Sequence, residues 1–133
     1  MFTRAVSFLD TVLVAVTPSR SEDLKIELLD SPQGARVIKL TGPLVLSNLF
    51  EFQDASRREA DKSVIVDISG VPYMDSAGLG AVISIFASCQ RTNRGFAITG
   101  VSPRIKTLFQ VTHCDGLLPC FETIAAADTA ISQ

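Results

Sequence analysis

The sequence predicts an α/β fold: a single domain with a mixed, mostly parallel sheet of about five strands and four helices in the order ββαβαβαβα. Three observations support this prediction. Two neighbouring segments near the start alternate apolar and charged residues, which is typical of a hairpin with one wet face. Residues 64–68 are nearly all apolar and β-branched, as expected of a central strand buried on both faces. Helical segments separate the later strands, which favours right-handed crossovers between parallel strands.

The predicted hairpin and the first helix occupy the first half of this domain. Residues 24–28 and 35–40 are the hairpin strands, and residues 30–34 supply the turn between them. Ser47 or Asn48 can cap a helix that runs to about residue 61. The apolar positions of this helix are Leu49, Phe50, Phe52 and Ala60. Its charged residues are expected to face water.

A long helix is predicted after Ser76. Its apolar residues recur close to helical spacing, at Leu79, Val82, Ile83, Phe86 and Ala87. The helix should end near residues 92–95, where Asn or Gly can adopt the left-handed conformation. Residues 96–101 then form a short strand.

The last two helices have recognisable starts. Ser102 followed by Pro103 combines an N-cap residue with proline at the first helical position. A short strand over residues 117–121 follows this helix, and Thr123 caps a final Ala-rich helix. Within the central strand, Asp67 is expected to bond to nearby N–H groups, the alternative being membership of a pocket at the strand's end.

Composition excludes several classes of function. The 133 residues include 12 basic and 14 acidic ones, with a formal net charge of -2 and no Lys/Arg cluster, so a nucleic-acid partner is not expected. The three cysteines, Cys89, Cys114 and Cys120, are scattered and odd in number, which favours reduced thiols in a cytoplasmic protein.

Residues 1–20 are predicted to be an N-terminal extension of a domain that spans residues 21–133. Their apolar run, residues 8–16, is far shorter than the roughly 20 residues of a membrane span. Asp10 interrupts this run and no clear cleavage site follows, so a signal peptide is less favoured than an extra element or a disordered start. Residues 1–20 are also compatible with a homodimer formed through this extension.

The predicted functional site is the junction between the central strand and the long helix. Pro72 stops the strand because it has no N–H for the ladder. Asp75 and Ser76 are both good N-cap residues, which places a hydroxyl at the positive end of a helix dipole.

Several chemistries are compatible with Ser76 in this place. A hydrolase would need the single histidine, His113, and has Met74 where a nucleophile elbow has glycine. Nucleotide binding is suggested weakly by Gly78 and Gly80, although close helix packing explains small residues more simply. Reversible phosphorylation would add charge without requiring a new fold. The residues alone leave a phosphorylation switch and a simple helix cap open.

Residues 73–80, Tyr-Met-Asp-Ser-Ala-Gly-Leu-Gly, closely resemble the signature of STAS domains, specifically those of bacterial anti-sigma factor antagonists. Residues 64–69 and 101–109 provide two further matches, and the resemblance extends from about Leu24 to the C-terminus. It implies a STAS-like single domain.

The resemblance also implies a mechanism. The unphosphorylated domain would bind an anti-sigma factor that is also an ATP-dependent serine kinase, and so free the sigma factor. Phosphorylation of Ser76 would dissociate the complex, and a phosphatase would reset it. The domain would be a regulator without catalytic residues, cofactor or metal. The implied partner-binding residues are Asp75, Ser76, Ala77, Gly78 and Leu79.

The chain departs from the family at the end of the second strand. Where family members often have Gly-Glu-x-Asp, it has Gly42-Pro43-Leu44-Val45, so Val45 replaces the aspartate. Gly-Pro-Leu resembles STAS domains of sulfate-type anion transporters. An alternative is therefore an interaction or small-ligand module of a signalling or transport complex that does not cycle through phosphate.

Overall fold

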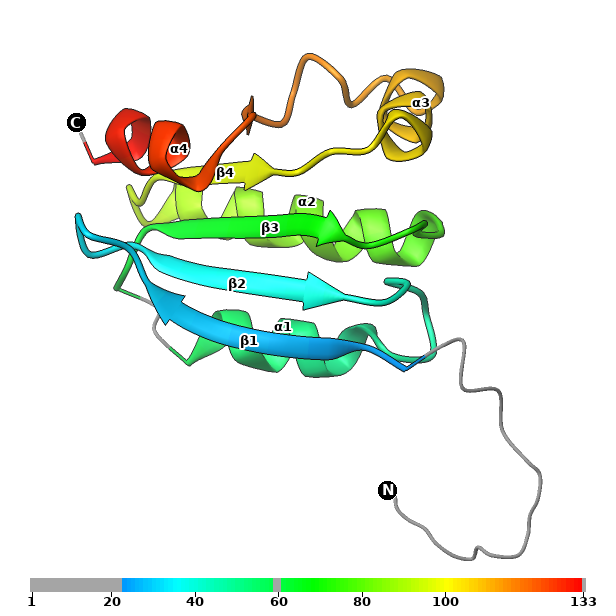
Figure 1. The fold of residues 1–133 in the computed structure, drawn as a ribbon, viewed down its shortest axis with the longest axis horizontal. Coiled ribbons are helices and arrows are strands. Elements are labelled where there is room, and N and C mark those ends of the chain that lie inside the picture. The colour runs from blue at the N-terminus through cyan, green and yellow to red at the C-terminus, as the bar shows by residue number, and fades with distance from the viewer. Residues whose placement is uncertain (1–22, 59–60, 133) are drawn as a thin grey trace, which may run out of the picture.

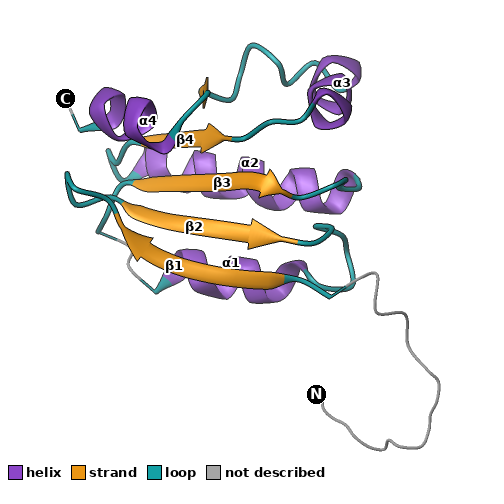
Figure 2. Ribbon diagram, in the orientation of Figure 1, coloured by secondary structure: helices purple, strands orange, loops and turns teal. Residues whose placement is uncertain are grey.

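Five strands form one sheet in the order β1-β2-β3-β4-β5 in the computed structural model, which describes residues 23–58 and 61–132 (Figures 1 and 2). β1 pairs antiparallel with β2, and β2, β3, β4 and β5 pair in parallel. The strands are β1 (Lys25–Asp30), β2 (Arg36–Thr41), β3 (Val64–Gly70), β4 (Phe96–Thr99) and β5 (Cys120–Phe121). This confirms the predicted mixed, mostly parallel sheet with an antiparallel hairpin at its edge. The predictions for residues 1–20 lie outside the described residues.

The helices are α1 (Leu49–Arg57), α2 (Ser76–Arg91), α3 (Pro103–Val111) and α4 (Ile124–Ile131). Helices α1 and α2 cover one face of the sheet (Figure 1). Helix α4 packs on the opposite face near the beginning of the parallel strands, and α3 lies at their carboxyl edge. The element order ββαβαβαβα is confirmed, as are the predicted side-chain caps Ser102 and Thr123.

Apolar residues of the sheet alternate between two cores. In β3, Val64 and Val66 belong to the larger core under α1 and α2, whereas Ile65 belongs to the smaller core under α4. Residues 64–68 are all buried, which confirms the central strand. Asp67, 5% exposed, accepts a hydrogen bond from the Ser69 N–H at 3.1 Å, so its local pairing is confirmed.

Three predicted segments are shorter in the structure. Strand β4 ends at Thr99 and not at residue 101. Helix α1 ends at Arg57, and its buried residues Leu49, Phe52 and Ala55 follow a three-residue spacing that leaves Phe50 64% exposed. The expected contribution of Phe50 to the buried stripe was therefore wrong. Strand β5 has only two residues. The Leu117 and Leu118 N–H groups donate to the Cys114 carbonyl, at 3.0 and 3.3 Å, and therefore form a turn instead of strand pairs. The proline directly before β5 has no N–H to donate to the sheet.

The loops that follow β2 and β3 meet at the carboxyl edge of the sheet. Leu44 and Met74 form an isolated parallel bridge between these loops. The Leu44 N–H donates to the Tyr73 carbonyl at 3.2 Å, and the Asp75 N–H donates to the Leu44 carbonyl at 3.3 Å. Strand pairing thus continues, in loosened form, to the start of α2.

Close packing against this loop requires glycine at position 78. A Cβ at Gly78 would collide with the Leu44 carbonyl oxygen, whereas a Cβ at Gly80 would meet open space. We therefore expect Gly78→Ala to lower the free energy of unfolding by about 1–3 kcal/mol. Gly80→Ala, the matched control, should be neutral or stabilising by up to about 1 kcal/mol. Urea denaturation measures both, and equal stability of the two variants would contradict the packing argument.

Candidate functional site

One carboxylate organises the junction between β3 and α2. Asp75 is the N-cap of α2, and its Oδ1 accepts a hydrogen bond from the Gly78 N–H at 2.8 Å. Its Oδ2 accepts a second hydrogen bond, at 3.1 Å, from the Leu46 N–H in the loop before α1. A negative charge at a helix N-terminus is favourable, and bonds to ionised acceptors are stronger than neutral ones. Asp75 therefore holds both the helix start and the neighbouring loop.

Ser76 is the first residue of α2 and is exposed. Because Asp75 occupies the cap, the Ser76 hydroxyl has no hydrogen-bond partner among residues 23–58 and 61–132. The interpretation of Ser76 as only a helix cap is therefore wrong. Its hydroxyl is accessible from solvent and is not needed for the fold.

Two large apolar side chains are exposed in the loop after β2 and in the first turn of α1. Leu46, whose N–H is bonded to Asp75, is 62% exposed, and Phe50 in the first turn of α1 is 64% exposed. Exposed apolar residues that cluster around one polar centre are typical of a surface that binds another protein. The sequence offered no signal for this surface, because Leu49, Phe50 and Phe52 are all apolar and only the packing of α1 shows which of them is exposed.

Helix α3 borders the junction on the other side of α2 (Figure 1). A hollow of about 330 Å³ lies between the β3–α2 loop and α3, lined by Tyr73, Met74, Arg104, Ile105, Thr107, Leu108 and Val111. The Arg104 guanidinium lies over the Tyr73 ring at 5.2 Å from its centroid, and Val111 is 70% exposed. We call Leu46, Phe50, Ser76, Arg104 and Val111 together the Ser76 surface.

The five residues expected to bind a partner differ in exposure. Asp75 and Ser76 are exposed and Ala77 is half-buried. Gly78 and Leu79 are buried, with Leu79 only 4% exposed in the larger core. The buried pair can shape the surface, and only the first three can touch a partner. Partner binding by all five stays a prediction.

Val45, which stands where the family often has aspartate, points into the protein. It is 7% exposed, and its N–H donates to the Asn48 Oδ1 at 3.0 Å. The Asn48 amide also donates to the Pro43 carbonyl at 2.9 Å. Asn48 is the N-cap residue of α1, at the position that the sequence predicted, but its side chain bonds to the loop and makes no capping hydrogen bond.

The structure does not assemble the catalytic alternative. Within the described part of the chain, His113 is exposed and forms no hydrogen bond with Ser76 or an aspartate.

All three cysteines are free. Burial raises the pKa of the Cys89 and Cys120 thiols, an effect that Arg94 and Lys106 respectively oppose, so neither is an activated nucleophile. No group of His, Cys, Asp and Glu residues in the same part of the chain can hold a metal ion. The close approach of Gly78 to the Leu44 carbonyl accounts for the glycine at this position.

Fold and site define an α/β domain with an accessible serine at the start of α2, next to an aspartate that caps this helix and holds the loop that carries the exposed Leu46. Residues 28–127 match the STAS domain model, and the chain belongs to the STAS domain family, among the anti-sigma factor antagonists. Members of this antagonist family are non-enzymatic regulators of transcription. None of the helices in the described residues has the length and apolarity to cross a bilayer.

Several known proteins are similar to this chain. The anti-sigma-B factor antagonist of Staphylococcus epidermidis is 31% identical over 84 residues, covering 61% of this chain and 78% of the relative. An anti-sigma factor antagonist from Mycobacterium paratuberculosis shares the fold with a TM-score of 0.73 and 18% identity, over 84% of this chain and 96% of that one. Unphosphorylated SpoIIAA, also an anti-sigma factor antagonist, has a TM-score of 0.67 and 17% identity, over 80% and 96% of the chains. The phosphorylated form of SpoIIAA from Bacillus has a TM-score of 0.63 and 17% identity, over 80% and 99%.

The two hydrogen bonds of Asp75 predict unequal effects at adjacent exposed positions. Asp75→Ala removes the cap of α2 and the bond to Leu46, so we expect the free energy of unfolding to fall by about 1–3 kcal/mol. Ser76→Ala removes a hydroxyl with no partner and should change it by less than about 0.5 kcal/mol. Chemical denaturation provides the measurement. A larger loss for Ser76→Ala than for Asp75→Ala would refute the assignment of the cap.

Proposed function

We propose that this protein is an anti-sigma factor antagonist whose unphosphorylated form binds an anti-sigma factor with serine kinase activity and thereby releases a sigma factor. Phosphorylation of Ser76 switches the protein off, and a phosphatase restores the unphosphorylated form. The cycle takes place in the cytoplasm. The observation that carries the proposal is the exposed Ser76 hydroxyl, which the Asp75 cap leaves without a structural role. Curated relatives that bear the antagonist name, and the phosphorylated form known for SpoIIAA, support it.

The proposed modification is a phosphoryl transfer from ATP. The Ser76 Oγ forms a bond to the γ-phosphorus, the bond from that phosphorus to the β–γ bridging oxygen breaks, and ADP leaves. The serine proton passes to a base of the kinase. This chain supplies only the acceptor hydroxyl, which requires access for the kinase and no catalytic group here.

The added charge would change the surface more than the fold. A phosphoserine contributes about -1.5 to -2 charges and three acceptor oxygens. The N-terminus of α2 tolerates an anion through its dipole and free N–H groups, whereas the adjacent Asp75 carboxylate repels one. Because the Asp75 oxygens are already bonded to Gly78 and Leu46, the cap can persist while the new charge faces outward.

Charge at this position opposes docking of an apolar partner surface. Leu46 and Phe50 lose contact with water when a partner covers them, and Ser76 lies next to the aspartate that holds Leu46. An anion buried in such a contact without a matching cation costs several kcal/mol. Asp75, Ser76 and Ala77 would touch the partner, and Gly78 and Leu79 would support them from inside.

A second candidate is a STAS module that binds its partner without a phosphate cycle. The observation that favours it is Val45, a buried apolar residue where the family often has an acidic one. This module would use the same Ser76 surface, with Ser76 as a contact residue that no kinase modifies.

Incubation with the cognate kinase and ATP distinguishes the two candidates. We expect one phosphate per chain, located on Ser76 by mass spectrometry, and none on Ser76→Ala. Ser76→Asp should weaken binding to the anti-sigma factor by at least about tenfold, since it places a charge in the contact, and Ser76→Ala should not. Unmodified Ser76 with every cognate kinase would refute the switch, as would equal affinities of the two variants.

The apolar part of the Ser76 surface gives a separate prediction. Leu46→Ser and Phe50→Ser should each weaken binding to the anti-sigma factor about tenfold or more, because burying such a side chain contributes about 1.5–3 kcal/mol. Leu29→Ser is the matched control, since Leu29 is 47% exposed on the far strand β1. Isothermal titration calorimetry measures all three affinities. A loss with Leu29→Ser that equals the other two would place the contact elsewhere.

A further inference from the structure

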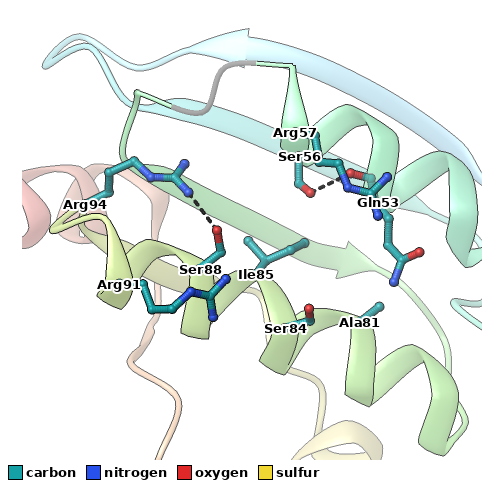
Figure 3. Close-up of a pocket in the computed structure, with 9 residues that line it drawn as sticks. All are labelled: Gln53, Ser56, Arg57, Ala81, Ser84, Ile85, Ser88, Arg91 and Arg94. Atoms are coloured by element: carbon teal, nitrogen blue, oxygen red, sulfur yellow. Dashed lines mark hydrogen bonds between the residues drawn. The ribbon is translucent and has the colours of Figure 1, made fainter.

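A second feature lies toward the other end of α2, where a polar groove of about 220 Å³ runs between α1 and α2 (Figure 3). Three arginines and three serines dominate its lining, which consists of Gln53, Ser56, Arg57, Ala81, Ser84, Ile85, Ser88, Arg91 and Arg94. Arg57 on α1 is distant in sequence from Arg91 and Arg94, and the packing of α1 beside α2 brings all three to one groove.

Arg94 is a fixed cation in this groove. Its Nε donates to the Thr92 Oγ1 at 2.7 Å, its Nη1 to the Lys62 carbonyl at 3.0 Å, and its Nη2 to the Ser88 Oγ at 3.2 Å. These three bonds hold the guanidinium plane in place before any ligand arrives. A preorganised donor loses less entropy on binding than a free surface side chain.

The other two arginines extend into the groove from its two walls. Figure 3 shows Arg91 on the α2 wall and Arg57 on the α1 wall. Arg57 pairs with Asp54 at 3.0 Å, but both side chains are more than two-thirds exposed, so the pair neutralises little. Arg91 and Arg94 have no carboxylate partner within residues 23–58 and 61–132. The groove therefore concentrates positive charge that the described residues leave largely unpaired.

Hydroxyl groups complete an anion-binding lining. Ser88 accepts from Arg94 through its oxygen, so its proton remains available to a ligand, and Ser84 is exposed beside it. Among the described residues, the apolar part of the lining is limited to Ala81 and Ile85, and none of the lining side chains is an aromatic ring that could stack on a base. This chemistry fits a compact anion with several oxygens.

We propose that the groove between α1 and α2 binds a small, multiply charged phosphate anion through Arg57, Arg91 and Arg94. Guanidinium groups match phosphate oxygens in geometry and charge, and three of them suit a pyrophosphate group better than a single phosphate. At about 1.5 Å per residue along α2, Arg91 lies about 22 Å from Ser76, whereas the lining of the groove begins at Ala81, about 8 Å from Ser76. The arginines that would bind the anion thus lie away from the Ser76 surface.

Calorimetric titration of the full chain with sodium pyrophosphate, at constant ionic strength set by chloride, tests the site. We expect saturable binding with one anion per chain, and a loss of at least about tenfold in affinity for Arg91→Gln. Arg58→Gln is the matched control. This substitution removes the same charge, but Arg58 lines a different hollow, between α1 and β1. The control should keep wild-type affinity. Absence of saturable binding, or equal losses in the two variants, would overturn the proposal.

Two further titrations define the ligand. ADP should bind with about the same affinity as pyrophosphate, because nothing in the groove contacts a base, and inorganic phosphate should bind more weakly. Binding of ADP that is tenfold tighter than that of pyrophosphate would overturn recognition through the phosphates alone. Ser76→Asp should leave pyrophosphate affinity unchanged, and a loss there would overturn the separateness of the two sites.

Discussion

The two hydrogen bonds accepted by the Asp75 carboxylate are the constraint on which the site depends. One satisfies a free N–H at the start of α2, and the other fixes the loop that presents Leu46. Because Asp75 caps the helix, the side chain of Ser76 is not needed to stabilise the start of α2. An accessible hydroxyl, a helix N-terminus and an exposed leucine therefore come together through a single side chain.

The sheet sets this arrangement in place. Parallel strands β2 and β3 end at the same edge, and the bridge between Leu44 and Met74 keeps their following loops in register. Gly78 then lets the first turn of α2 approach the Leu44 carbonyl. These contacts lie beneath the surface, so a change of charge on Ser76 need not disturb them. Helix α2 consequently links two chemically different places, the Ser76 surface at its start and the basic groove that extends to its other end.

Much of the fold was predictable because its signals are local. The β-branched run of β3, the hairpin alternation and the caps Ser102 and Thr123 each identify an element from its own residues. The choice between Asp75 and Ser76 as cap was not predictable, because both residue types cap well and only the helix register decides.

Other features depend on contacts between distant segments. The exposure of Phe50 follows from which side of α1 meets the sheet, which adjacent apolar residues do not reveal. The basic groove joins Arg57 to Arg91 and Arg94, whose charges in the sequence predict only a solvated face. Its existence depends on how α1 packs beside α2.

The central claim is that Ser76 can accept a phosphate while the Asp75 bonds remain. Amide NMR spectra with hydrogen-exchange rates, recorded before and after stoichiometric phosphorylation, test it most directly. The account predicts shifts confined to residues 42–50 and 71–80, with the Gly78 and Leu46 amides still protected. Rapid exchange of those two amides, or shifts spread through the sheet, would contradict it.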